Sequence, residues 1–249
     1  VLLPVMAVCA LILPANFSTS AVLFISCLFL MLIGRVSIKH IFSMLGIGVA
    51  AFSLYVVFAF ATGHPGRINT WIGRVERFWQ PKEDTGNGII SDENYQTDQA
   101  KIAIAGGGLV GKFPGNSTQR NFLPHPYSDF IFAIIVEEYG FIGGALILFL
   151  YLLLFYRVIR FIHHSPMAFG TLVSVGCIFI LIFQALINMA VAVGLFPVTG
   201  QPLPLVSMGG SSIWFTSIAI GIVLSISRET EKTKTVLSEE PEGGALATA

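Results

Sequence analysis

Charged residues are scarce in this chain. Asp, Glu, Lys and Arg make up 11% of it, whereas an average soluble domain contains about 25%. The formal net charge is zero, which gives no support to a general electrostatic attraction to nucleic acid. With 54% hydrophobic residues and a mean hydropathy of +0.78, the composition predicts an integral membrane protein.

Cysteine is also rare. Cys9, Cys27 and Cys177 each lie in an apolar run and lack the spacing of a metal site, a redox motif or a disulfide framework. We therefore expect three small buried side chains. The sequence begins inside an apolar run, without an initiator Met, a basic start or a signal-peptide cleavage site. This beginning predicts a fragment that lacks earlier membrane segments.

Long apolar runs are the main feature of the sequence. A spanning helix needs about 20 mostly apolar residues. The runs are 1–13 (short or truncated), 18–34, 41–63, 130–156, 168–194 and 208–227. They predict an all-α, polytopic helical bundle with six spans. Three lie within residues 1–63 and three within 129–228, separated by a large insertion at 64–128 and followed by a charged, disordered tail at 229–249.

The placement of basic residues predicts the orientation. Loops 35–40 and 157–165 and the tail carry Lys or Arg, whereas loops 14–17 and 195–207 carry no charge. Because cytoplasmic loops are enriched in Lys and Arg, the first group and the C-terminus are expected in the cytoplasm. The insertion 64–128 then faces the periplasm.

The insertion contains two predicted helices and one misleading motif. Residues 70–80 have an apolar and a charged face, typical of a helix on a membrane surface or of one packed on its neighbours. Residues 94–105 predict a second helix, ended by a glycine run. Gly106 to Lys112 fits the opening of a phosphate-binding loop, but Phe113 stands where Ser or Thr is required and no strand precedes it. We therefore discard nucleotide binding.

Three carboxylates mark the start of the fourth span. Asp129 stands where a polar loop meets the apolar run, and Glu137 and Glu138 lie inside that run. Carboxylates are costly at membrane depth and usually mark function, although Ser128 or Asp129 could instead serve as a helix N-cap. In a regular helix Glu137 would lie about 12 Å deeper than Asp129 on the same face. The two carboxylates would then line one wall.

The later spans also contain polar residues. Gln184 and Asn188 are four apart and share one helix face, so they either bond neighbouring helices or serve a site. Residues 201–212 contain two prolines, two glycines and three serines. Irregular backbone at membrane depth is tolerated only where protein buries it or where it lines a wet cavity.

Several of these motifs together resemble one family, the SEDS proteins (shape, elongation, division and sporulation). The resembling segments are Arg74-Val75, Tyr95-Gln96, Gly107-Gly108, Gly115–Ser117, Leu123-Pro124, Asp129–Ala133, Glu137–Gly143 and Pro204–Ser212. Residues 114–119 look more like the division branch, FtsW, than the elongation branch, RodA, and the style is similar to that branch in Bacteroidetes.

The resemblance implies a ten-span protein of the bacterial inner membrane, of which this chain would be spans five to ten. It implies a glycosyltransferase that polymerises lipid II, the undecaprenyl-pyrophosphate disaccharide-peptide, with a class B penicillin-binding protein and other divisome proteins as partners. The family's essential Asp falls on Asp129, for which we hypothesise the role of general base. The alternatives are a lipid II flippase, an elongation-type polymerase and a non-catalytic division scaffold.

The residues and the resemblance together suggest supporting residues. We expect substrate contacts from Arg74, Lys112, Arg120, Glu137, Ser207, Gly209, Gly210 and Ser211. The departing pyrophosphate needs a cation or a divalent metal, and Arg74 is favoured because it lies in a family motif. Orienting roles are expected for Asn16, Gln184, Asn188 and Glu138. Asn16 stands where many members have Asp. We predict no metal site built from protein ligands.

Overall fold

The computed structural model describes residues 2–62, 68–79, 92–123, 126–162 and 168–239. All regular structure in these ranges is helical, which confirms the all-α fold class. The helices are α1 (Leu2–Ile12), α2 (Phe17–Ile33), α3 (Ile38–Ala61), α4 (Ile68–Trp79), α5 (Asp92–Gly107), η1 (Gln119–Asn121), α6 (Ile131–Ile162), α7 (Ala168–Ala192) and α8 (Gly210–Glu239). The predictions that involve Pro124, residues 163–165 and the end of the tail lie outside the described residues.

Four helices in the described part of the chain, α3, α6, α7 and α8, are long and apolar enough to cross a membrane. Helices α1 and α2 are apolar but shorter. The chain is therefore a multi-pass membrane protein, and the count of six spans stays a prediction.

The end of α8 corrects the predicted tail. The disorder expected from Glu229 is wrong as far as Glu239, because α8 continues to that residue. Glu and Lys are good helix formers. The Lys232 ammonium also lies 3.8 Å from the Glu229 carboxylate, one turn earlier in the helix. Local propensity therefore extends the helix beyond its apolar part.

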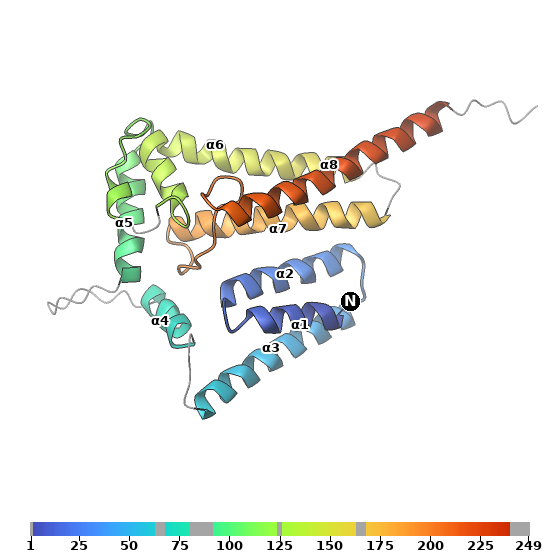
Figure 1. Ribbon diagram of the computed structural model, residues 1–249, viewed down its shortest axis with the longest axis horizontal. Helices are drawn as coiled ribbons and strands as arrows, with labels where there is room; N and C mark the ends of the chain where they lie inside the picture. Colours follow the sequence, from blue (N-terminus) through green and yellow to red (C-terminus); the bar gives the residue numbers. More distant parts are fainter. Residues whose placement is uncertain (1, 63–67, 80–91, 124–125, 163–167, 240–249) are drawn as a thin grey trace, which may run out of the picture.

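Helix α7 lies at the centre of the bundle. It packs against α2, α6 and α8, while α1 packs on α2 (Figure 1). Ile178, Leu181 and Ala185 of α7 belong to one apolar core with Val136 and Tyr151 of α6. Helices α4 and α5 lie across one end of the bundle (Figure 1). Many side chains of α7 are therefore buried by the neighbouring helices.

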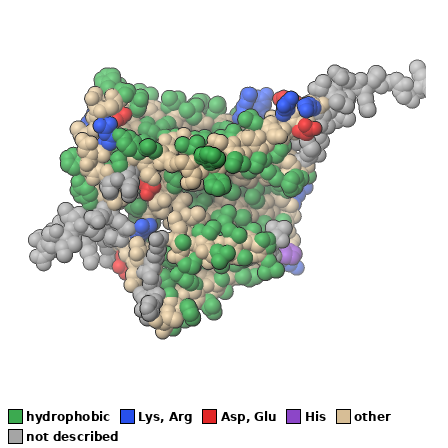
Figure 2. Space-filling model, viewed as in Figure 1, with side chains coloured by type: hydrophobic (Ala, Val, Ile, Leu, Met, Phe, Trp, Pro, Cys, Tyr) green, Lys and Arg blue, Asp and Glu red, His purple; other side chains and the backbone are tan. Residues whose placement is uncertain are grey.

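The surface has the pattern of a membrane protein. Hydrophobic side chains cover the sides of the bundle, and charged side chains gather toward its two ends (Figure 2). Exposed residues of α3 such as Phe42, Leu54 and Phe58 lie on these sides. In lipid such exposure carries no hydrophobic cost, because hydrocarbon tails are as apolar as the side chains.

The segments predicted to share one side of the membrane meet at one end of the molecule. The amide of Gln201, after α7, donates to the Thr19 hydroxyl at the start of α2 (2.7 Å). The Arg74 guanidinium, on α4, donates to the Val198 carbonyl (3.3 Å). We call this the loop end. It gathers the segments that precede α2, α6 and α8.

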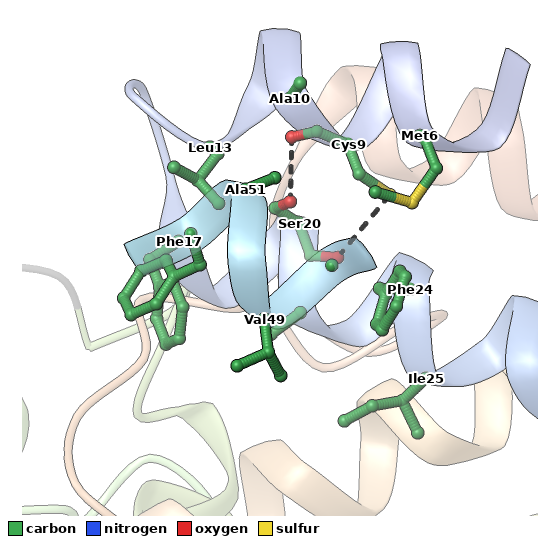
Figure 3. Close-up of a pocket in the computed structure, with 13 residues that line it drawn as sticks. Met6, Cys9, Ala10, Leu13, Phe17, Ser20, Phe24, Ile25, Val49 and Ala51 are labelled. Atoms are coloured by element: carbon green, nitrogen blue, oxygen red, sulfur yellow. Dashed lines mark hydrogen bonds between the residues drawn. The ribbon is translucent and has the colours of Figure 1, made fainter. Parts of the chain in front are cut away.

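A cavity of about 280 Å³ lies between α1, α2 and α3 (Figure 3). Its lining is apolar except for Cys9 and Ser20. The Ser20 hydroxyl donates to the Cys9 carbonyl (2.9 Å), which ties α1 to α2. The cavity offers no free polar group for chemistry.

Candidate active site

Asp129 lies in a turn just before α6, at the loop end. Helix α6 begins at Ile131, and the Phe130 carbonyl accepts a hydrogen bond from the Ile134 N–H (3.3 Å). Phe130 therefore occupies the N-cap position, so the alternative that Ser128 or Asp129 caps the helix is wrong. The Asp129 carboxylate is half-buried and accepts a hydrogen bond from the Ser128 hydroxyl (2.9 Å).

The main chain of this turn is held at three consecutive carbonyls. The Tyr127 carbonyl accepts from the Met208 N–H (2.8 Å) and the Ser128 carbonyl from the Ser207 hydroxyl (2.6 Å). The Asp129 carbonyl accepts from the Asn188 side-chain amide (2.9 Å). The backbone is thus fixed, while the carboxylate keeps part of its surface accessible.

Residues 200–208, which we call the proline loop, provide most of these contacts. Within the loop, the Ser207 hydroxyl accepts from the Leu203 N–H (2.6 Å). The carbonyls of Pro202 and Pro204 accept from Gln184 (3.2 Å) and from the Tyr151 hydroxyl, respectively. The irregular backbone predicted here is therefore satisfied by polar side chains that are buried (Tyr151, Ser207) or half-buried (Gln184), as membrane depth requires.

Asn16 serves a structural purpose. It is the N-cap of α2, and its side chain accepts from the Thr19 N–H (3.3 Å). The Thr19 hydroxyl accepts from Gln201, whose carbonyl accepts from Asn188 (2.7 Å). A chain of hydrogen bonds thus joins the start of α2 to the Asp129 turn.

The Arg74 side chain contacts the segment 198–200, which lies beside Asp129. Its guanidinium donates to the Val198 carbonyl (3.3 Å). Two residues further on, Gly200 has φ +65, and a Cβ built there would lie 3.8 Å from Asp129 Oδ2. A cationic group and the candidate base therefore lie along the same short segment.

The surroundings of Glu137 differ from the predicted substrate contact and the predicted wall shared with Asp129. Its carboxylate has 0% exposed surface and accepts from Lys112 Nζ (2.7 Å), Ser117 Oγ (2.5 Å) and Thr118 Oγ1 (2.8 Å). Because Asp129 precedes the helix, the expected wall shared by the two carboxylates does not form. Glu137 instead fastens the loop that follows α5 to α6.

We expect Glu137→Gln to destabilise the protein by about 3 kcal/mol. Breaking a buried ion pair costs about 3 to 5 kcal/mol, and the lower end applies because the Lys112 side chain is 36% exposed and can be hydrated. The matched control is Glu138→Gln, at the neighbouring half-buried carboxylate, with an expected change within about 0.5 kcal/mol. Thermal unfolding in detergent measures both, and equal losses would contradict the proposed fastening.

The glycines of the motif at residues 106–112 allow its backbone to pack closely against the backbone of α6. Helix α6 is broken at Gly140 (φ 69, ψ −170), and α5 ends against this break. A Cβ at Gly107 would overlap the Val136 carbonyl, and one at Gly111 would overlap the Glu138 carbonyl. The Phe141 N–H donates to the Gly108 carbonyl (2.9 Å) instead of continuing the helix. This packing accounts for the glycines without a phosphate ligand.

The other predicted residues are scattered along the loop end. Arg120 is half-buried in η1. The Gly209 carbonyl accepts from the Ile213 N–H (3.1 Å), and Gly210 and the exposed Ser211 begin α8. Glu138 contributes its carbonyl to the Gly111 contact. No sequence pattern predicted a role for Thr19, Ser117, Thr118, Tyr151 or Gln201. Of these, Ser117, Thr118 and Gln201 lie within segments that the sequence motifs already included, at 114–119 and 201–212.

Within the described residues, no group of three His, Cys, Asp or Glu side chains could hold a metal ion. The divalent cation considered for the departing pyrophosphate stays a prediction.

The profile of the FtsW, RodA and SpoVE family of cell cycle proteins matches residues 1–232. The chain belongs to this family. It is 39% identical over 216 residues to stage V sporulation protein E of Bacillus subtilis, which covers 86% of this chain and 55% of that protein. It is 33% identical over 244 residues to the probable peptidoglycan glycosyltransferase FtsW of Marinobacter nauticus, covering 95% and 58%.

A solved structure agrees with this assignment to the SEDS family. The matched chain comes from a study of how a peptidoglycan synthase complex coordinates polymerization and crosslinking. It superposes with a TM-score of 0.65 at 25% identity, over 92% of this chain and 60% of that chain. The present chain thus spans somewhat more than half the length of these relatives.

Proposed function

We propose that the intact protein is a membrane-embedded polymerase of lipid II, with Asp129 as its general base. The observation that carries the proposal is the half-buried Asp129 carboxylate on a backbone fixed at three carbonyls. FtsW relatives of this chain bear the name probable peptidoglycan glycosyltransferase. A loop-end position suits a substrate whose lipid tail stays in the bilayer while its sugars reach the aqueous side.

In the proposed step, a sugar hydroxyl of one lipid-linked substrate attacks the anomeric carbon of another. The new bond joins that oxygen to the anomeric carbon, and the bond from this carbon to the pyrophosphate oxygen breaks. Asp129 takes the hydroxyl proton, and the electron pair of the broken bond leaves with the undecaprenyl pyrophosphate. A general base in such a position contributes about 10² to 10⁴ in rate.

Arg74 is the cation that we assign to the leaving pyrophosphate. It lies along the segment that passes Asp129, and a positioned cation stabilises charge that develops in the transition state. Lys112 is less suited to this role, because its ammonium pairs with Glu137 at 2.7 Å. Arg120, on η1, remains a proposed secondary contact.

We further propose that the loop end faces the periplasm and the C-terminus the cytoplasm of the bacterial inner membrane. The basic residues of loops 35–40 and 157–165 support this orientation. A class B penicillin-binding protein is the proposed partner, because the solved relative comes from a complex that couples polymerization to crosslinking. The division role rests on the resemblance of residues 114–119 to FtsW.

The product distinguishes this proposal from lipid II transport. Intact protein in liposomes, supplied with lipid II from outside, is expected to form glycan strands that gel electrophoresis resolves. A flippase instead moves labelled lipid II between leaflets without forming strands. Transport without polymer, in a preparation that contains the crosslinking partner, would contradict the proposed function.

A further inference from the structure

We propose that Asn188 is the positioning residue of Asp129, assisted by Ser207, and that neither residue touches the substrate. The inference rests on the proposed role of Asp129 as the base. It also gives Ser207 a different role from the substrate contact that the sequence predicts.

Burial separates the two side chains from the substrate. Asn188 is 2% exposed and Ser207 is 3% exposed. Both donate hydrogen bonds to main-chain carbonyls: the Asn188 side-chain amide to the Asp129 carbonyl, and the Ser207 hydroxyl to the Ser128 carbonyl. A substrate that reaches the Asp129 carboxylate therefore meets the carboxylate and not the groups behind it.

The chemistry of Asn188 suits it to hold two segments together. One amide nitrogen donates to the Asp129 carbonyl (2.9 Å) and to the Gln201 carbonyl (2.7 Å). Carbonyls only accept hydrogen bonds, so the NH₂ group must be the one that faces them. Its two N–H bonds diverge at a fixed angle, so the turn and the proline loop are held at one separation. An ionised Asp at this position would have no donor for either carbonyl.

Stability alone does not account for Asn188. Its side-chain oxygen is buried and has no hydrogen-bond partner among the described residues, which is unfavourable for folding. The proline loop also contains Leu205 at φ 67, a conformation that non-glycine residues seldom adopt. Such backbone persists only where the surroundings over-determine it. Both features indicate that the proline loop is held in one conformation because a functional site requires it.

The consequence for Asp129 is a defined carboxylate position. With the carbonyls of Tyr127, Ser128 and Asp129 fixed, only the side-chain torsions of Asp129 remain free. The Ser128 hydroxyl restrains these torsions at 2.9 Å. Gly200 has no side chain to fill the space beside Oδ2. Loss of the Asn188 donors releases the backbone, and a misplacement of 1 Å in a reacting group can cost about 100-fold in rate.

The test is the isosteric change Asn188→Asp in the intact protein, assayed with lipid II in liposomes. We expect kcat to fall between about 10-fold and 100-fold, with KM for lipid II unchanged because no substrate contact is lost. Bound lipid II per protein is measured beside it, so that a partly unfolded sample is not counted as slow enzyme. Ser207→Ala is the second variant, with a smaller fall in kcat and the same KM.

Ser174→Ala is the matched control. Ser174 lies on the same helix, has 0% exposed surface, and its hydroxyl has no hydrogen-bond partner in the described structure. Its kcat and KM are expected to equal those of the wild type.

Wild-type kcat in both Asn188→Asp and Ser207→Ala, with Asp129→Asn inactive, would overturn the positioning role alone. A raised KM at unchanged kcat would also overturn it, by showing a substrate contact. If Asn188→Asp does not fold, Ser207→Ala decides. An active Asp129→Asn protein would instead contradict the proposed function, so the two failures are distinguishable.

Discussion

Asp129→Asn is expected to lower lipid II polymerisation by at least about 100-fold. The loss follows from the removal of the general base, a group that contributes about 10² to 10⁴ in rate. The fold should be unaffected. An Asn oxygen can still accept from the Ser128 hydroxyl, and the carbonyl of residue 129 can still accept from Asn188. Strand synthesis from labelled lipid II, together with a thermal unfolding midpoint, measures the effect.

The control for this change is Asp98→Asn. Asp98 lies on α5, near the same end of the molecule, and its side chain is 68% exposed. Within the described part of the chain its ion pairing is limited to a surface pair with Lys101 at 3.7 Å, which contributes little. Its polymerisation rate should match that of the wild type. A normal rate in Asp129→Asn would remove Asp129 from the chemistry, and equal losses in both variants would indicate a general charge effect.

The helices were predictable because their signals are local. Apolar runs located α2, α3 and α7 to within a few residues, and two-faced periodicity located α4. The break in α6 was not predictable in the same way. Glycine at 140 is compatible with a continuous helix, and the backbone atoms that crowd it belong to Leu109 and Gly111, far away in the sequence. Tertiary contact decides this conformation.

In the candidate site, too, the sequence indicated some features and not others. The sequence indicated that Asp129, Glu137 and Asn188 were costly to bury and therefore had a purpose. It did not indicate which groups would pair. Glu137 binds Lys112 and the residues after it, while Asn188 holds the backbone of Asp129. These pairings join segments 25 and 59 residues apart. The assumption of one continuous helix from Asp129 placed the two carboxylates together wrongly.

Gly140→Ala is expected to prevent accumulation of folded protein. Gly140 has φ 69 and ψ −170, a region that is essentially restricted to glycine, where another residue costs about 1 to 3 kcal/mol. A Cβ there would also overlap the Leu109 carbonyl, and forced overpacking adds about 1 to 3 kcal/mol. The combined cost, about 2 to 6 kcal/mol, approaches the total stability of many proteins, about 5 to 15 kcal/mol. Yield of monodisperse protein from membranes, and its unfolding midpoint, measure this outcome.

The comparison that isolates the cause uses Asn at two glycines. Gly108 also has a positive φ of 55, but a Cβ there meets nothing within 4 Å. Asn tolerates positive φ better than most residues. Gly108→Asn is therefore expected to fold with nearly wild-type stability, and Gly140→Asn to fail as Gly140→Ala does. If Gly140→Ala were as stable as Gly108→Asn, the break would not be required for α5 to pack against α6. The placement of Glu137, and with it the loop that follows α5, would then need another explanation.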